Sequence, residues 1–588
     1  MKIKRLLMAL MVGLCVFLAS ATLLTACGQG KTATEGIQYE VVDNAAQVVG
    51  YTGTDKYVRI AEKVGPFYVR SIADEAFKSC SEIRSVEIPD SVESIGENAF
   101  QYCKSLTGVA IGNGVKTINN YAFSYCDSLT AIVIPDSVES IGSGAFAYCG
   151  NLTSVVLGSS VESIGYGAFY ECYKLVEAVN KSPHITITKD AYGNGDIGYY
   201  ALAVYNSGDV FTGTKISNDN GYIVFTNGDE KVLIGYNGEE TNLVFPAYIT
   251  KINRCAFYDC DNITSVVFPD GLDSIGPSAF GSCNQLESVE IPDSVISIGG
   301  GAFQGCISLT SATIGNRVEI IEYNAFGSCI NLTSVVIPDS VISIDCGAFE
   351  ACNNLASVVL GSSVESIGSE AFDRCYKLVE VVNKSAHITI TKGDLKNGNI
   401  GYYALAVYNS DDVFTGTKIS NDNGCMIYTD GDEKILVGYN GTETNLTIPD
   451  NITKINPYAF YKCSTITRVV IGDGVVSIGA SAFRNCANLA SVVVGKGVIS
   501  IGSNAFNSCS SLRSVVIGES VESISYAVFG SCNNLTSVTF KDTSTWYSVY
   551  KSADWTNKSG GTLEDVTSAR DNATYFKTLK TQAYWYKL

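Results

Sequence analysis

The chain has 588 residues, a formal net charge of −19 and a hydrophobic fraction of 46%. This length is too great for one compact core, so the chain needs several domains or a repeat architecture. The acidic balance argues against nucleic-acid binding, which needs a basic footprint.

The N-terminal segment differs from the rest of the chain. A basic start is followed by an apolar run over residues 6–24, then by Leu-Thr-Ala-Cys ending at Cys27 and by Gly-Gln-Gly. This pattern resembles the bacterial lipobox. The resemblance implies that residues 1–26 are a lipoprotein signal peptide, that Cys27 is lipidated, and that 27–36 form a linker. The alternative is an uncleaved transmembrane helix, since the apolar run is long enough to span a bilayer.

Residues 37–76 follow as a predicted N-terminal cap. The stretch from Tyr39 to Tyr51 is followed by Thr-Gly-Thr-Asp, as Tyr236 is followed by Asn-Gly-Glu-Glu, and it reads as a degenerate copy of hairpins found later in the chain. Solenoids need polar-faced caps, so we expect this hairpin to begin the fold.

An internal repeat organises most of the sequence. A Phe, after Ala in all but one case, recurs every 23 residues within three series, and a Cys stands three residues after each Phe. The fifteen repeats run from Phe77 to Phe169, from Phe257 to Phe372 and from Phe460 to Phe529. They define three blocks, at residues 77–175, 251–378 and 454–540.

Each repeat contains the signals of one solenoid coil. In the segment from Cys103 to Ile111, the apolar residues Leu106, Val109 and Ile111 have the spacing of a strand with one buried face. A second short extended piece follows, and in several repeats a Gly comes after it (Gly96, Gly142 and Gly165), which permits a sharp or left-handed turn. The Ala-Phe-x-x-Cys run has helical spacing for one or two turns. No coil could bury its apolar face alone, so stacking must supply the core.

These residues resemble the BspA-like (LRR_5-type) branch of the leucine-rich repeats, over about two-thirds of the chain. The predicted fold is therefore mainly β with short helical turns: a leucine-rich-repeat solenoid of fifteen 23-residue coils in three blocks, with β-hairpin-containing inserts. The resemblance also implies a bacterial surface protein, often an adhesin that contacts host matrix proteins or other microbes.

Two inserts separate the blocks, at residues 176–250 and 379–453. They are copies of each other at an offset of 203 residues, as Ile197–Tyr205 and Ile400–Tyr408 show. Each ends in a predicted hairpin, with Asn227-Gly228 or Asp430-Gly431 as the turn signal.

Residues 541–588 leave the repeat and contain all three Trp of the chain: Trp546, Trp555 and Trp585. We expect a C-terminal cap here. The alternative is an aromatic module that binds glycans or cell-wall polymer with its ring faces.

The residues for catalysis or metal binding are sparse, so we predict no enzyme activity, no cofactor and no metal site. The chain has two His, His184 and His387, at equivalent positions of the two inserts. Neither a histidine triad nor a zinc site can be assembled within one module. The Asn218–Gly221 run lacks the acidic residue that a calcium loop needs and is predicted to be a turn.

The Cys of each coil is expected to be a small buried apolar residue with a free thiol. Coil spacing alone would not forbid disulfides between neighbours, but side chains on a ladder point the same way. Cys255, Cys346 and Cys425 break the register and are predicted to be the exposed or reactive thiols.

Two surfaces are candidates for binding. The strand face carries outward Val, such as Val133 and Val156, beside small residues such as Ser154, and forms a flat apolar ladder. The turn side carries Tyr102, Tyr125 and Tyr148 at the repeat spacing, as an exposed aromatic row. Each pattern also has a structural interpretation, as strand propensity or as cover for the coil edge.

The sequence therefore predicts a non-enzymatic surface lipoprotein that mediates adhesion or protein–protein interaction through its solenoid. Its expected partners are host or microbial surface proteins, or glycans bound by the aromatic tail, together with the membrane through the N-terminal lipid. It would lie on the extracellular face of the bacterial cell membrane.

Overall fold

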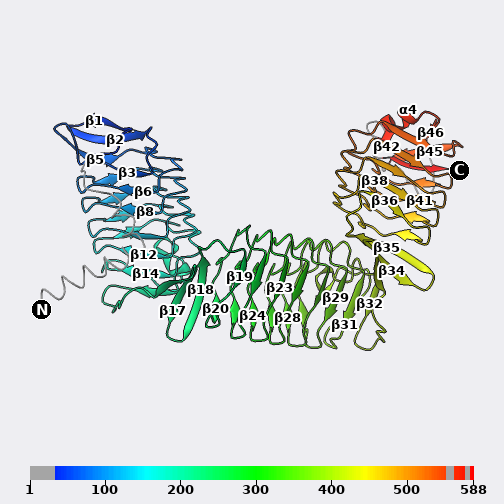
Figure 1. Ribbon diagram of the computed structural model, residues 1–588, viewed down its shortest axis with the longest axis horizontal. Coiled ribbons are helices and arrows are strands. Elements are labelled where there is room, and N and C mark those ends of the chain that lie inside the picture. Colours follow the sequence, from blue (N-terminus) through cyan, green and yellow to red (C-terminus); the bar gives the residue numbers. More distant parts are fainter. Residues whose placement is uncertain (1–32, 551–561, 577–582, 588) are drawn as a thin grey trace. The chain divides into compact units, whose positions relative to one another are not determined.

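The structure is a computed structural model, and it describes residues 33–550, 562–576 and 583–587. The chain divides into two compact units, which are described separately. Unit 1 comprises residues 1–239, 246–258 and 275–279, and unit 2 comprises 240–245, 259–274 and 280–588. In both units, short strands stack into ladders of parallel neighbours, which is the solenoid that the sequence predicts (Figure 1).

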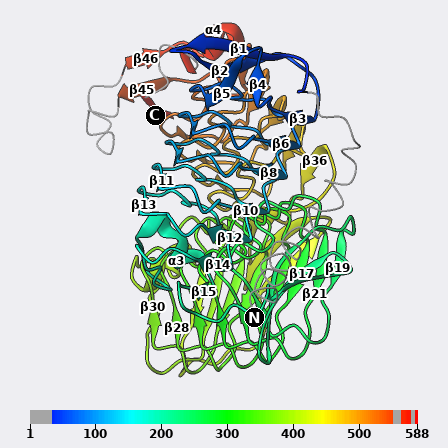
Figure 2. The same cartoon turned by 90° about the vertical axis from the view of Figure 1, so that its left-hand side faces the viewer.

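Unit 1 begins with an antiparallel hairpin, and a ladder of two-residue strands continues from it. The ladder order is β1 (Ile37–Val42), β2 (Ala45–Tyr51), β5 (Phe67–Ile72), β7 (Ser94–Ile95), β9 (Thr117–Ile118), β11 (Ser140–Ile141) and β13 (Ser163–Ile164), with β4 (Lys63–Val64) beside β5. Figure 2 shows β1 and β2 across the end of the coils. The predicted starting hairpin is confirmed, with Asp43 and Asn44 in the left-handed conformation at its turn.

A second ladder in unit 1 holds the longer strand of each coil. It runs through β3 (Tyr57–Arg59), β6 (Ser85–Glu87) and β8 (Gly108–Ala110), and through β10 (Ala131–Val133), β12 (Ser154–Leu157), β14 (Glu177–Asn180) and β15 (Ala203–Tyr205). Between β14 and β15 lie the short helices η1 (Asn194–Asp196) and α3 (Ile197–Tyr200).

The first insert starts a new ladder in unit 1. β16 (Ile216–Asp219), β17 (Tyr222–Asn227) and β18 (Glu230–Tyr236) form an antiparallel three-stranded sheet, and β18 pairs in parallel with β20 (Lys251–Ile252). The predicted hairpin is confirmed, but its two-residue turn is Gly228-Asp229 and not Asn227-Gly228, because Asn227 still pairs with Glu230. Phe225, Val232 and Ile234 pack on Val176 of the preceding block, so the insert closes one block and opens the next.

Unit 2 contains the rest of the second block. Its longer strands are β19 (Asn242–Val244), β21 (Ser265–Val267), β23 (Ser288–Glu290) and β25 (Ser311–Thr313), and then β27 (Ser334–Val336), β29 (Ser357–Leu360), β31 (Glu380–Asn383) and β32 (Ala406–Tyr408). Its shorter strands are β24 (Ser297–Ile298), β26 (Ile320–Ile321), β28 (Ser343–Ile344) and β30 (Ser366–Ile367), and the division between the units falls within β22 (Ser274–Ile275). The helix η2 (Asn397–Asn399) follows in the second insert.

The second insert repeats the arrangement of the first. Its strands are β33 (Ile419–Asp422), β34 (Cys425–Asp430) and β35 (Glu433–Tyr439), followed by β37 (Lys454–Ile455), β39 (Ser477–Ile478), β41 (Ser500–Ile501) and β43 (Ser523–Ile524). The longer strands of this block are β36 (Asn445–Ile448), β38 (Arg468–Ile471), β40 (Ser491–Val493), β42 (Ser514–Ile517) and β44 (Ser537–Phe540).

The C-terminal region caps this last block. β47 (Ala583–Lys587) pairs antiparallel with β43, and β45 (Trp546–Tyr550) and β46 (Thr562–Glu564) extend the sheet. The helix α4 (Ala569–Thr574) contacts β44. The described tail residues therefore cover the ends of both ladders, as a solenoid cap must.

A column of stacked Phe rings fills the core of each block. In unit 1 the rings from Phe77 to Phe169 stack with centroids 4.8–5.3 Å apart, and each ring is fully buried. In unit 2 the rings from Phe280 to Phe372 stack at 5.2–5.4 Å. The repeat places one ring per coil, and the coil spacing brings neighbouring rings into offset contact.

The Ala-Phe-x-x-Cys run forms separate turns and not the one or two continuous helical turns that its spacing suggests. The Phe100 amide donates to Ala122 O of the next coil at 2.7 Å, whereas the Gln101 amide donates to Asn98 O in its own coil. Alternate amides thus bond to the neighbouring coil, which interrupts the helical hydrogen-bond ladder.

In some coils a Gly follows the shorter strand, and it has a different role from the left-handed turn that the sequence allows. Gly142 and Gly165 do not adopt positive φ. A Cβ at Gly142 would lie 2.5 Å from Asn120 N, and one at Gly165 would lie 2.4 Å from Ser143 N. At these two positions Gly avoids a close approach to the backbone of the preceding coil. Other coils hold Asn119, Glu322 or Asp345 at the equivalent position, so the fold does not require Gly in every coil.

Candidate functional site

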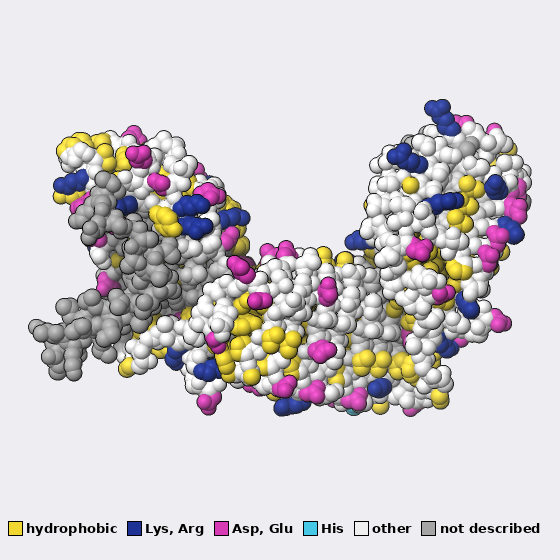
Figure 3. All heavy atoms as spheres, viewed as in Figure 1, with side chains coloured by type: hydrophobic (Ala, Val, Ile, Leu, Met, Phe, Trp, Pro, Cys, Tyr) yellow, Lys and Arg dark blue, Asp and Glu magenta, His cyan; other side chains and the backbone are white. Residues whose placement is uncertain are grey.

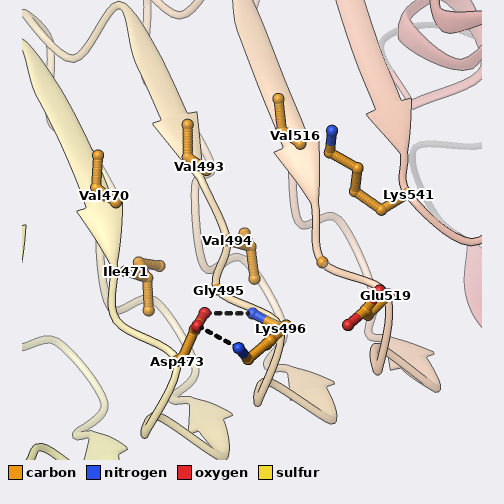
Figure 4. Close-up of a pocket in the computed structure, with 11 residues that line it drawn as sticks. Val470, Ile471, Asp473, Val493, Val494, Gly495, Lys496, Val516, Glu519 and Lys541 are labelled. Carbon is orange, nitrogen blue, oxygen red and sulfur yellow. Dashed lines mark hydrogen bonds and ion pairs between the residues drawn. The ribbon is translucent and has the colours of Figure 1, made fainter. Parts of the chain in front are cut away.

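The strand face of the last block carries a row of Val side chains. Val470, Val493 and Val516 occupy matching positions of β38, β40 and β42, and the three strands pair in register. All three are half-buried, and Figure 4 shows them directed to the same side. This row is the flat apolar ladder that the alternation of the sequence predicts.

Charged side chains form a rim where these strands end. Asp473 accepts hydrogen bonds from the Lys496 backbone amide at 3.0 Å and pairs with its ammonium at 3.0 Å. These bonds lower the pKa of Asp473. Glu519 and Lys541 follow on the next coils, and the Lys541 ammonium lies beside Val516 (Figure 4).

The row and the rim together line a hollow of about 280 Å³, which spans adjacent coils of the last block. A second hollow, of about 360 Å³, occupies the same part of the coil in unit 1, where Arg59 pairs with Glu87 at 3.1 Å. Both lie at the ends of the longer strands, so the hollow belongs to the edge of the coil. An apolar floor beside alternating charges suits an extended polypeptide lying across the coils.

The predicted strand-face residues of unit 1 are only partly exposed. Val133 is 39% exposed and Ser154 is half-buried. Val156 is 9% exposed, so its prediction as a surface residue is wrong. Val156 pairs with Val133 on one side and with Val179 on the other, and these two branched side chains flank it.

The predicted Tyr row exists, but its rings stack on one another. The Tyr102 and Tyr125 centroids lie 4.6 Å apart and those of Tyr125 and Tyr148 lie 4.3 Å apart. Tyr170 meets Tyr148 edge-on at 5.6 Å. Partial burial and the neighbouring Tyr148 phenol raise the pKa of Tyr125. Stacking covers the inner ring faces, so the row presents phenolic edges to solvent and not the broad faces that bind sugars.

The aromatic tail does not present the predicted binding face. Trp546 and Trp585 are each 1% exposed. Trp546 contacts Phe540 at 4.9 Å between ring centroids, and Trp585 contacts Phe576 at 4.5 Å. The expectation that these two rings are exposed for binding is wrong, because their apolar area covers the last coil. Trp555 lies outside the described residues.

Most repeat cysteines are buried free thiols, as predicted, and Cys80, Cys260 and Cys463 in the first coil of each block are partly exposed. Cys103, Cys306 and Cys352 each donate through Sγ to a Phe carbonyl of the preceding coil, at 3.1–3.2 Å. Burial raises the pKa of each of these thiols to about 12.

The three out-of-register cysteines behave differently from one another. Cys346 is exposed and lies 3.1 Å from the Ser369 hydroxyl. Cys255 and Cys425 are buried, and burial raises their pKa values to about 12 and about 11. The prediction of an exposed thiol is therefore confirmed for Cys346 and wrong for the other two.

Other predicted features can be placed in the described part of the chain. It contains no group of three or more His, Cys, Asp or Glu arranged to hold a metal ion. Asn218 accepts a hydrogen bond from the Gly221 amide and closes a turn, as expected. None of the helices in these ranges has both the length and the apolarity needed to cross a membrane. The predicted signal segment and the predicted lipidation site, Cys27, lie outside the described residues.

Sequence reasoning missed a row of Asp residues that link neighbouring coils. Each accepts a hydrogen bond from the backbone amide of the residue 23 positions later, at 2.7–3.0 Å. The row comprises Asp90, Asp136, Asp293, Asp339, Asp450 and Asp473. The recurring Ile-Pro-Asp triplet was a visible signal for it.

Comparison with known proteins gives one family. A family model described as the BspA type leucine rich repeat region matches residues 69–197, 236–326, 274–401 and 439–553, with six copies. No curated protein matches the chain.

Solved structures of bacterial leucine-rich repeat proteins are also similar. A leucine-rich cell surface protein from Faecalibacterium prausnitzii is 28% identical over 60% of this chain and 95% of its own, with a TM-score of 0.30. One from Eubacterium ventriosum is 21% identical over 63% and 98%, with a TM-score of 0.37. The pneumococcal vaccine antigen PcpA is 19% identical over 66% and 98%, with a TM-score of 0.33.

Proposed function

Because the chain belongs to the BspA type leucine-rich repeat family, we propose that it is a non-enzymatic cell-surface protein that binds other proteins through the strand face of its solenoid. The partners are surface proteins of host cells or of other microbes. Single contacts on a flat face are weak, but a rigid array repeats them and so gains avidity.

The observation that carries this proposal is the set of exposed apolar side chains on paired strands. Val244, Val267 and Val336 on the strand face of unit 2 are 65%, 55% and 58% exposed. Val244 and Val267 are neighbours in paired register, whereas the exposed Glu290 and Thr313 separate Val267 from Val336. Exposed apolar side chains on such a face mark protein contact sites more often than small-molecule sites. The charged rim beside Val493 would fix the orientation of a bound polypeptide.

The last block, whose hollow has Val470, Val493 and Val516 in its lining, provides the test. We expect the triple substitution of Val470, Val493 and Val516 to Ser to weaken binding to a protein partner about tenfold or more, since it removes the apolar floor. Binding of the full chain, displayed on bacteria, would be measured against arrayed matrix proteins and epithelial cells.

The same coils provide a matched control. Val476 and Ile499 are 44% and 42% exposed and precede the shorter strands, so Val476→Ser with Ile499→Ser removes apolar surface elsewhere. Equal loss in both variants would contradict a role for the strand face. Absence of binding to every protein and cell tested would contradict the proposed function itself.

We also propose that Cys27 carries the lipid that holds the protein on the membrane, which the lipobox-like sequence supports. Intact-mass analysis of the membrane fraction should give a chain that begins at Cys27 with added acyl mass. The Cys27→Ala variant should lack both the processing and the added mass. An unprocessed wild-type chain would contradict the anchor.

A further inference from the structure

The first strand of unit 1 has an edge on which no other described strand pairs. Among the described residues, β1 pairs with β2 alone and ends its sheet. Val41 and Val42 on β1 are 48% and 46% exposed, and Val49 on β2 is 36% exposed. Figure 3 shows hydrophobic side chains gathered at this end of unit 1. An apolar edge strand of this kind is a site for pairing with another strand.

The inner hairpins show how such an edge is covered within the same chain. β17 and β34 are the counterparts of β1, and each pairs on its outer side with a further antiparallel strand, β16 or β33. Both covering strands have the sequence Ile-Ser-Asn-Asp. The hairpin edge of this module is therefore built to receive an antiparallel strand.

The chain just before the first hairpin does not follow the path that covers the inner hairpins. Gly36 and Gly221 occupy equivalent turns, with φ of 87° and 90°. Two residues before Gly36, the path differs. The Thr34 amide donates to Arg59 O at 3.0 Å, and Thr34 Oγ1 accepts from the Arg59 amide at 2.8 Å. Thr34 is therefore held against β3, whereas its counterpart Asp219 pairs in the covering strand.

The turn geometry shows which backbone groups of β1 face outward. Val42 and Ala45 flank a two-residue turn and are partners in the ladder, so they exchange hydrogen bonds. In an antiparallel pair of strands, hydrogen-bonded and non-hydrogen-bonded residue pairs alternate. The amide and carbonyl groups of Tyr39 and Val41 therefore point away from β2.

We propose that this edge is a homodimer interface, on which β1 of a second copy docks antiparallel about a two-fold axis at Tyr39. The outward groups of Tyr39 then meet those of the second Tyr39, and Ile37 lies opposite Val41. On the other face of the sheet, Gln38 lies opposite Glu40 of the second copy, and the amide can donate to the carboxylate. The alternative register, with the two-fold axis at Glu40, would place the two Glu40 carboxylates opposite each other. Repulsion between these like charges disfavours it.

The dimer is weak by construction. The edge contributes six residues per copy, whereas a stable interface uses roughly 20–30 residues a side. Association therefore depends on concentration, and confinement of the chains to a surface would favour it.

Charge substitution at one exposed position tests both the edge and the register. The full chain carrying Cys27→Ala, in non-ionic detergent, would be followed by sedimentation velocity at increasing concentration, so that shared lipid anchors cannot join two copies. Gln38→Lys should tighten the dimer about threefold, because two new pairs with Glu40 form, and Gln38→Glu should weaken it by a similar factor. Gln304→Lys adds the same charge at an exposed position of unit 2 and should change nothing.

Amide exchange gives an independent readout. The Tyr39 and Val41 amides should exchange quickly in dilute monomer and slowly in the dimer. Protection in the monomer would mean that the chain covers its own edge, and it would overturn the proposal. Three sedimentation results would also overturn it. The chain could stay monomeric in every variant, or the dimer affinity could be unchanged by substitution of Gln38. The third is a dimer strengthened more by Glu40→Gln than by Gln38→Lys.

Discussion

At the scale of single residues, the neighbouring coils are joined by side chains that the apolar pattern does not reveal. Asp339 accepts the Ser362 backbone amide at 2.9 Å, and this bond lowers the pKa of its carboxyl group. It satisfies a donor that the turn of the next coil leaves without a backbone partner, as an N-cap does for a helix.

This bond makes part of the stability depend on pH. Since the folded-state pKa of Asp339 is lowered, its contribution is complete above the unfolded value of about 3.9 and is lost as the pH falls toward the folded value. At pH 7 we expect Asp339→Ala to cost about 1 kcal/mol and Asp339→Asn to cost less, because Asn keeps an acceptor.

Chemical denaturation from neutral to acidic pH would check this expectation. The difference in unfolding free energy between the wild type and Asp339→Ala should narrow as the carboxyl group protonates. A difference that stays constant to the lowest pH at which the protein folds would contradict the role of the ionised carboxylate.

At the scale of the element, the 23-residue repeat predicted the coils well because one pattern recurs in each. Its alternation identified the buried Leu106 and the outward row that includes Val493. The inserts were harder, since β15 and β19 continue ladders without the Ala-Phe signature. The tail has no repeat for alignment, and nothing local distinguishes a Trp that covers a core from one that binds a ligand.

The ladder register makes the coil the natural unit of change. Deletion of residues 288–310 removes one 23-residue repeat and joins matching positions. We expect this variant to fold with a small loss of stability, because nearest-neighbour contacts are restored. Deletion of 288–309 shifts every following strand by one residue and should destabilise the block strongly, since buried side chains move to the solvent face.

Circular dichroism and thermal unfolding would compare the two deletions. Equal stability of the two variants would show that the block tolerates a register slip, against the strand pairing described here.

At the scale of the whole molecule, the thiols are nearly all withdrawn from solvent. Most of the described repeat cysteines are buried, and Cys346 is exposed. Thiolates react, and a raised pKa keeps a buried thiol protonated at neutral pH. A chain with this composition can therefore keep its thiols in an oxidising environment.

Alkylation of the native protein would test this protection. Iodoacetamide should modify Cys346 first, and the Cys346→Ser variant should lose that first event. The buried thiols, such as Cys103 and Cys352, should react only when denaturant unfolds the coils. Rapid modification of Cys103 in native conditions, mapped by peptide mass spectrometry, would contradict the buried column.

The duplicated module has a consequence for the gene. Each copy carries its own opening hairpin and meets the next at matching positions 203 residues apart. Unequal crossing-over between the two copies would add or remove a module in frame, with the first hairpin and the terminal cap left unchanged. Such recombination would change the number of stacked coils and of strand faces without new sequence at either end.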